Sequence, residues 1–217
     1  MVKSLLVFLV FITALTACSS SDIDPFDDAI QTFLNQNHQG YDYEMKQTLS
    51  GEVTNHVMVE KRVDNREELK AYLWIQQQQL LPLEETLYQN TESIYYFQNP
   101  NKLIVDDGYE LTTSNITYDE FIKLNQLPTI HLSETYLKDY KISDDDVMIL
   151  TAKINPNKVC QMLQIDHTDM REATLSVKIQ DETLLNLELI LIQPLSKITI
   201  TIETHLGSDD VIMPSLD

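Results

Sequence analysis

The sequence predicts an α+β domain built on an antiparallel β-sheet with few helices. Segments in which apolar and polar residues alternate, or in which apolar residues run continuously, recur along most of the chain. The clearest is 197–205, where Ile198, Ile200 and Ile202 alternate with polar residues, as in a strand with one buried face. Short turns connect these segments, and parallel strands would need much longer crossovers. We therefore expect an antiparallel meander.

A helix is expected before the first strand, over about residues 25–37. Asp24 and Pro25 are typical of a helix start, and Gly40 can end the segment. Apolar residues recur between them at helical spacing and form one stripe. The stripe consists of Phe26, Ala29, Ile30, Phe33 and Leu34.

Strands are expected on both sides of a helical middle. Tight turns such as Ser50-Gly51 and Asn99-Pro100-Asn101 separate them. In the first half the expected strands lie near 41–45, 53–59, 71–75, 83–89, 93–98 and 102–105. In the second half they lie at 147–154, 172–180, 184–192 and 197–205, with a last edge segment at 211–214.

Three short helices are expected in between. Thr117 and Glu120 have the spacing of a capping box, and Pro128 stops the helix that they begin. A second helix is expected after Ser133, and a third after Asn155, which a proline follows.

The first residues predict export and a lipid anchor. Residues 5–15 form an apolar run behind Lys3, shorter than the roughly 20 residues that span a bilayer, as in a secretory signal. Leu15, Thr16, Ala17 and Cys18 resemble the bacterial lipobox. The resemblance implies that the leader is cut before Cys18 and that a diacylglycerol is attached to the cysteine sulfur. An ordinary cleaved signal with a chance cysteine is the alternative.

A lipobox divides the chain into three parts. Residues 1–17 are a lipoprotein signal peptide, 18–24 are the lipidated cysteine with a polar tether, and 25–217 are one domain. Two acyl chains suffice for stable anchoring. The expected location is the extracytoplasmic face of the cell membrane, with the membrane itself as a partner.

Composition excludes several classes of function. The chain has 34 acidic and 15 basic residues and a formal net charge of −19, which disfavours nucleic acid because phosphates require Lys and Arg. With only 4 glycines there is no phosphate-binding glycine loop, and no cofactor is expected. Of 2 cysteines, lipidation of Cys18 leaves only Cys160, so no internal disulfide is expected.

The sequence contains one possible metal-ligand set and one possible nucleophile pair, and neither is favoured. Asp166, His167 and Asp169 could ligate a metal, but turn chemistry explains such aspartates better. Cys160 could pair with His167 as a nucleophile, but it lies on the apolar side of an expected helix and is better explained as an inert buried thiol. We therefore expect no enzyme.

The order of elements resembles a group of bacterial lipoproteins. A lipobox, an N-terminal amphipathic helix, a long meander, helices midway and the closing stretch KITITIETHLGSDDVIMP together resemble the LolA/LolB and LppX/LprG-like domains. This resemblance implies a strongly curved antiparallel sheet, a half-barrel, with helices covering its concave face. It also implies a cavity between them that receives the acyl chains of a lipid or lipoprotein.

Large apolar residues of the expected strands and helices are the candidate lining of such a cavity, although each is better explained as ordinary core. They are Phe33, Met45, Tyr72, Trp74, Tyr96, Phe121, Met162, Leu187 and Leu189. The alternative function is a surface interaction protein with a filled core, whose acidic face binds another envelope protein. A transporter's solute-binding protein is a weaker third hypothesis, because two α/β lobes are missing.

Overall fold

The computed structural model describes residues 21–216, except residues 37, 81–87, 126 and 166–168. The helices are α1 (Asp24–Gln36), α2 (Tyr118–Ile122) and α3 (Pro156–Leu163), with a 3₁₀ turn η1 (Glu134–Tyr136). The first strands are β1 (Tyr41–Leu49), β2 (Glu52–Asp64), β3 (Lys70–Leu80), β4 (Tyr88–Gln98), β5 (Lys102–Asp106) and β6 (Leu111–Asn115). The later strands are β7 (Leu137–Asp144), β8 (Met148–Ile154), β9 (Glu172–Gln180), β10 (Thr183–Ile192) and β11 (Ser196–Thr204).

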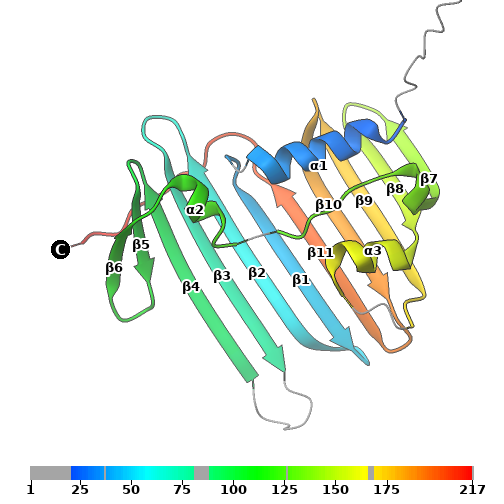
Figure 1. Cartoon of the computed structure of the whole chain (residues 1–217), viewed down its shortest axis with the longest axis horizontal. Helices are drawn as coiled ribbons and strands as arrows, with labels where there is room; N and C mark the ends of the chain where they lie inside the picture. The colour runs from blue at the N-terminus through cyan, green and yellow to red at the C-terminus, as the bar shows by residue number, and fades with distance from the viewer. Residues whose placement is uncertain (1–20, 37, 81–87, 126, 166–168, 217) are drawn as a thin grey trace, which may run out of the picture.

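All the strands belong to one open antiparallel sheet of 11 strands, ordered β6-β5-β4-β3-β2-β1-β11-β10-β9-β8-β7 (Figure 1). The sheet therefore consists of two meanders, β1 to β6 and β7 to β11. The first and last strands of the chain join them, with Tyr41 opposite Thr204 and Leu49 opposite Ser196.

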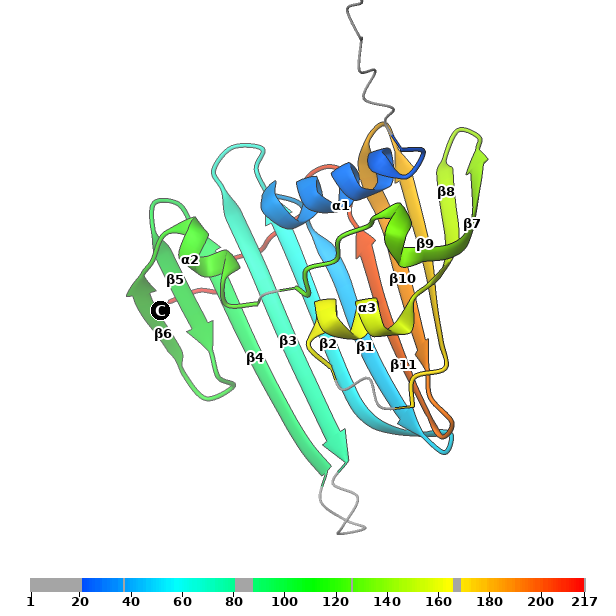
Figure 2. The ribbon, with the colours of Figure 1, turned by 45° about the vertical axis from the view of Figure 1, so that its right-hand side comes forward.

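The three helices lie on the same face of the sheet, which we call the helix face (Figures 1 and 2). α1 packs on β9 and β10, and α3 packs on β9. Between them, Phe26 and Ile30 of α1 join Val177 and Leu187 of the sheet in one core, all at most 1 % exposed. After α2, the chain runs across the helix face from the β6 edge to the β7 edge (Figure 2).

The opposite face, which we call the outer face, carries the other half of the alternating side chains. In β9 the residues from Ala173 to Ile179 alternate between buried and more exposed positions, as period two requires. Within the described residues, no helix has the length and apolar character needed to cross a bilayer.

Most of the expected elements are confirmed. The first helix, the capping box of α2 and the start of α3 at Asn155 lie where the pattern places them. The Asn155 side chain accepts a hydrogen bond from the Asn157 backbone amide at 3.1 Å. The antiparallel meander is confirmed in every strand pair, and the glutamine run 76–79 is part of β3.

The prediction of a helix after Ser133 is wrong. Only the 3₁₀ turn η1 forms there, and the next residues make β7, with Ile142 opposite Leu150 of β8. The spacing of Tyr136, Leu137 and Tyr140 suits a helix, but pairing with β8 satisfies the backbone groups and overrides this local preference.

The structure differs from the sequence analysis at two further places, the C-terminal tail and β6. Residues 211–214 form no strand, because side chains hold this tail instead: the Asp209 carboxylate accepts from the Val63 amide at 3.0 Å. β6 is a strand that the sequence did not predict, since LTTSN lacks the expected apolar alternation. The expected strand at 83–89 lies outside the described residues up to 87, and its last two residues begin β4.

Candidate functional site

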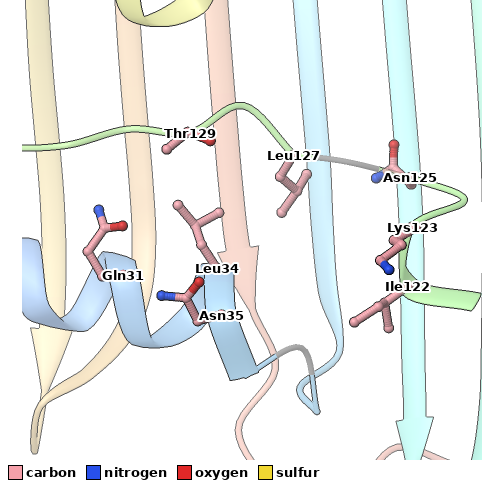
Figure 3. A pocket seen from close by; sticks show the side chains of 8 residues that line it. All are labelled: Gln31, Leu34, Asn35, Ile122, Lys123, Asn125, Leu127 and Thr129. Atoms are coloured by element: carbon pink, nitrogen blue, oxygen red, sulfur yellow. The ribbon is translucent and has the colours of Figure 1, made fainter. Parts of the chain in front are cut away.

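A cleft opens on the helix face between the second half of α1 and the segment that follows α2. We call it the helix-side cleft, and the described residues 123–125 and 127–129 the crossing segment. The cleft has a volume of about 340 Å³ (Figure 3). The side chains that line it are Gln31, Leu34, Asn35, Ile122, Lys123, Asn125, Leu127 and Thr129.

The helix wall of the cleft follows from the amphipathic pattern of α1. Its buried stripe, which includes Phe33, packs into the core, and residues 31, 34 and 35 share the adjacent flank because they are three and four positions apart. Gln31 is fixed there, since its amide donates to the Ile130 carbonyl oxygen at 2.7 Å. This wall therefore belongs to a rigid element.

The opposite wall is held at both ends. At one end Phe121 is fully buried, with its ring centroid 5.5 Å from that of Phe97. At the other end Ile130 and Leu132 are buried, and the Leu132 amide donates to the Asp27 carboxylate at 2.7 Å. The crossing segment spans the distance between these two attachments and covers the cleft along one side (Figure 3).

Asn125 connects the crossing segment to the sheet. Its amide donates to the Tyr41 hydroxyl at 3.1 Å. Burial raises the pKa of Tyr41 to about 12, and this hydrogen bond opposes the rise only in part. The hydroxyl is therefore neutral and can act as donor and acceptor behind the cleft wall.

A buried lysine lies behind Tyr41. The Lys61 side chain points to the helix face from β2 opposite Tyr41, and the residue is 2 % exposed. Its Nζ lies 5.6 Å from the Tyr41 ring centroid and 5.7 Å from that of Tyr118, which are cation–π distances. Burial lowers the pKa of the Lys61 ammonium to about 7 and raises that of the Tyr118 hydroxyl.

The candidate lining residues named from the sequence divide between the two faces. Phe33, Phe121, Leu187 and Leu189 are members of the buried core, and Met45 and Met162 pack against it. Tyr72, Trp74 and Tyr96 lie on the outer face, because they alternate with the buried residues Ala71, Leu73 and Phe97. One cavity cannot be lined by both groups.

None of these nine residues is among the side chains that line the helix-side cleft. The amphipathic stripe of α1 could have indicated Leu34. No motif in the sequence marks the crossing segment, whose position depends on tertiary contacts at its two ends.

The outer face has a separate hollow of about 390 Å³ over the central strands, lined in part by Trp74. Here three carboxylates stand side by side across three strands: Glu203 pairs with Asp42, and Asp42 pairs with Glu60. Arg62 bridges Asp42 at 2.8 Å and Glu60 at 2.9 Å. Like charges directly opposite one another destabilise a sheet, so this row departs from ordinary strand pairing.

The possible metal-ligand set and the possible nucleophile pair both include residues outside the described part of the chain. Asp166 and His167 are outside the described residues, as is Cys18, and Cys160 is buried in α3. In the part of the chain that is described, no three His, Cys, Asp or Glu side chains are grouped as metal ligands would be.

Fold and cleft together define a class: an α+β protein with one open antiparallel sheet and a cleft under its helices. No family model and no curated protein matches the sequence. Among solved structures, the chain is similar to LprF from Mycobacterium bovis, with 10% sequence identity and a TM-score of 0.39, over 88% of this chain and 94% of that one. At so low a TM-score, no property of LprF is transferred to this chain.

Proposed function

We propose that this protein is a membrane-anchored lipoprotein that binds an apolar ligand, a lipid or another acylated molecule, in the helix-side cleft. The observation that carries the proposal is the cleft itself. Its volume of about 340 Å³ lies at the low end of the roughly 300–1,000 Å³ of small-molecule sites. Three apolar side chains, Leu34, Ile122 and Leu127, stand beside polar ones, so the cleft offers both an apolar and a polar wall to an amphiphile.

The size of the cleft favours a ligand with a single acyl chain. A two-chain lipid would require the crossing segment to move away from the sheet. The bond between Asn125 and Tyr41 is a neutral hydrogen bond, with a net contribution of about 0.5–1.5 kcal/mol, so it opposes such movement only weakly. In this proposal the sheet is the half-barrel of the LolA-like group, and the helices cover its concave face.

Native mass spectrometry tests the binding. The chain from Ser19, which contains all the described strands and helices, is incubated with bacterial membrane lipids, purified again, measured intact and extracted with organic solvent. A one-to-one adduct with the mass of an acylated molecule supports the proposal. A bare protein that also takes up no added lipid contradicts it.

A cleft-filling variant assigns the adduct to its site. Leu127→Trp places an indole in the cleft and should abolish the adduct. Leu195→Trp is the matched control, because Leu195 is 69% exposed in the turn between β10 and β11, away from the cleft. Equal adducts in both variants would place the ligand elsewhere.

The anchor is tested separately. In bacteria grown with labelled palmitate, the full chain should carry the label and Cys18→Ser should not, since the substitution removes the thiol that carries the diacylglycerol. Equal labelling of both chains would contradict a lipid anchor at Cys18.

The carboxylate row supports a second candidate, a non-catalytic interaction protein whose acidic outer face binds a cationic region of another envelope protein. A partner's lysines or arginines would relieve the repulsion among Glu203, Asp42 and Glu60. A lysine-rich peptide should then bind with an affinity that falls with salt and is lowered by Glu203→Gln but not by Glu172→Gln at the far end of β9. Salt-independent binding would contradict this candidate.

A further inference from the structure

The helix-side cleft differs in charge from the larger hollows of this acidic protein. Hollows of about 390, 390 and 540 Å³ are each lined by three or four carboxylates. Among the described residues, no carboxylate lines the helix-side cleft, and its one charged lining residue is Lys123. In a chain with 34 acidic and 15 basic residues, a cleft of this composition is suited to an anion.

The Glu120 carboxylate of α2 does not line the cleft and is bonded within its own helix start. Glu120 accepts hydrogen bonds from the Thr117 amide at 2.7 Å and from the Thr117 hydroxyl at 2.9 Å, completing the capping box. These bonds hold the carboxylate at the start of α2, whereas Lys123 follows its end. The hydrogen bonds from Thr117 lower the pKa of the Glu120 carboxyl, and the Lys123 charge adds to this effect, so Glu120 is engaged mainly within its own capping box.

Neutral donors accompany the ammonium. Asn35 and Thr129 are exposed on opposite sides of the cleft, and their side chains carry N–H and O–H groups that can bind an oxyanion (Figure 3). Behind the wall, the buried Lys61 lies against the Tyr41 ring, and the Tyr41 hydroxyl accepts a hydrogen bond from Asn125 of the cleft. The carboxyl end of α1 carries a partial negative charge. It amounts to only about half an elementary charge, and its effect falls off within the last turn of the helix.

We propose that the cleft selects a single-chain amphiphile with an anionic oxyanion headgroup, a carboxylate or a phosphate monoester, and that Lys123 contacts this headgroup. The inference rests on the proposed function and names its ligand class. Leu34, Ile122 and Leu127 receive the chain, while Lys123 at the open side receives the charge.

Isothermal titration of the chain from Ser19 tests the selectivity. The probes share a twelve-carbon chain and differ in headgroup: dodecanoate, dodecyl phosphate, monododecanoyl glycerol and dodecyltrimethylammonium, each below its micelle-forming concentration. Acetate and inorganic phosphate test the headgroups without a chain. One charge-assisted hydrogen bond predicts that the anionic chains bind about tenfold more tightly than the neutral one, and that acetate and phosphate bind far more weakly. Tighter binding of dodecanoate or of dodecyl phosphate distinguishes the two headgroups.

Three variants assign the selectivity to the site. Lys123→Gln should lower the affinity for the anionic chains to that of the neutral one. Lys178→Gln, on the exposed outer face of β9, should change nothing, and Leu127→Trp should abolish binding of every chain. Unaltered selectivity in Lys123→Gln would overturn the role of Lys123.

The outcomes separate the two proposals. If all four chains bind alike and Leu127→Trp removes them, the cleft binds chains but the headgroup inference is wrong. If the cationic chain binds most tightly, the inference is also wrong. If no chain binds, the proposed function fails and the inference fails with it.

Discussion

A lysine enclosed by two tyrosine rings makes the stability of this protein depend on pH. Lys61 has a pKa of about 7 in the folded chain, against an ordinary value of 10.5. Between these values the unfolded chain binds more protons, so the free energy of unfolding rises with pH from about 7 towards 10.5. Below pH 7 the full cost of burying the ammonium is present.

Replacing this lysine should therefore stabilise the protein at neutral pH. In Lys61→Met, the contribution of about 2 kcal/mol that the wild type gains between pH 7 and 9 should disappear, and the variant should be the more stable of the two at pH 7. Urea unfolding at pH 6, 7, 8 and 9 measures this difference. Lys46→Met, at a half-buried place in β1, is the control, and equal pH slopes in wild type and Lys61→Met would contradict the prediction.

Single residues also show which parts of the core and of the cleft can be predicted from the sequence and which cannot. Apolar size identified core residues such as Leu187 and Phe121, since large apolar side chains are mostly buried in any fold. It could not tell which strand face Trp74 or Tyr72 occupies, because both parities of β3 carry large apolar residues. Lys61 and Lys123 lie in no motif, and only the fold gives them their surroundings.

At the scale of elements, the turn between β9 and β10 has a sequence that does not suit its backbone. Thr183 pairs with Gln180, so Asp181 and Glu182 form a two-residue turn, with φ of 48° and 62°. Two-residue turns with both φ positive favour Gly at the second place, because a Cβ is strained there. The turn between β1 and β2 has Ser50 and Gly51 at the equivalent places.

Glu182→Gly should accordingly stabilise the protein. The change creates Asp-Gly, a preferred pair for such turns, and should raise the free energy of unfolding by about 0.5–1 kcal/mol. Denaturant melts at a fixed pH measure it. Glu172→Gly, at an exposed place within β9, should have the opposite sign, and stabilisation by both changes would point to lost charge as the cause.

Elements with their own local signal were the predictable ones. The helix α1 has an amphipathic stripe, and β11 has strict alternation, so both were placed almost to the residue. β6 and β7 are the edges of the sheet, where the burial pattern is weak: β7 has no fully buried residue. Pairing with β5 and β8 defines these two strands, and such pairing leaves little trace in a single sequence.

At the scale of the whole molecule, the C-terminal tail fastens the end of β11 to the N-terminal meander. The Asp209 backbone amide donates to the Val63 carbonyl oxygen at 2.8 Å, and the Asp209 carboxylate accepts from the Val63 amide. Gly40, just before β1, lies against this carboxylate, so that a Cβ at Gly40 would collide with it.

Gly40→Ala should therefore destabilise the protein by about 1–3 kcal/mol through overpacking. The cost should be smaller when Asp209→Ala removes the colliding group, which makes the two substitutions non-additive. A double-mutant cycle of unfolding free energies measures this coupling. Strict additivity would show that the tail does not hold its place against Gly40.

The pairing of β1 with β11 has a consequence for how the chain folds. Within each meander, strands pair with sequence neighbours, but this central pairing joins residues from opposite ends of the chain, such as Tyr41 and Thr204. Non-local pairing is slow because a large loop must close first. Until the last strand is available, β1 presents an open edge with unpaired backbone groups, which other chains can join. Truncation before Ser196 should therefore leave two separate half sheets with β1 as an additional open edge, and the truncated chain should aggregate more readily than the full one.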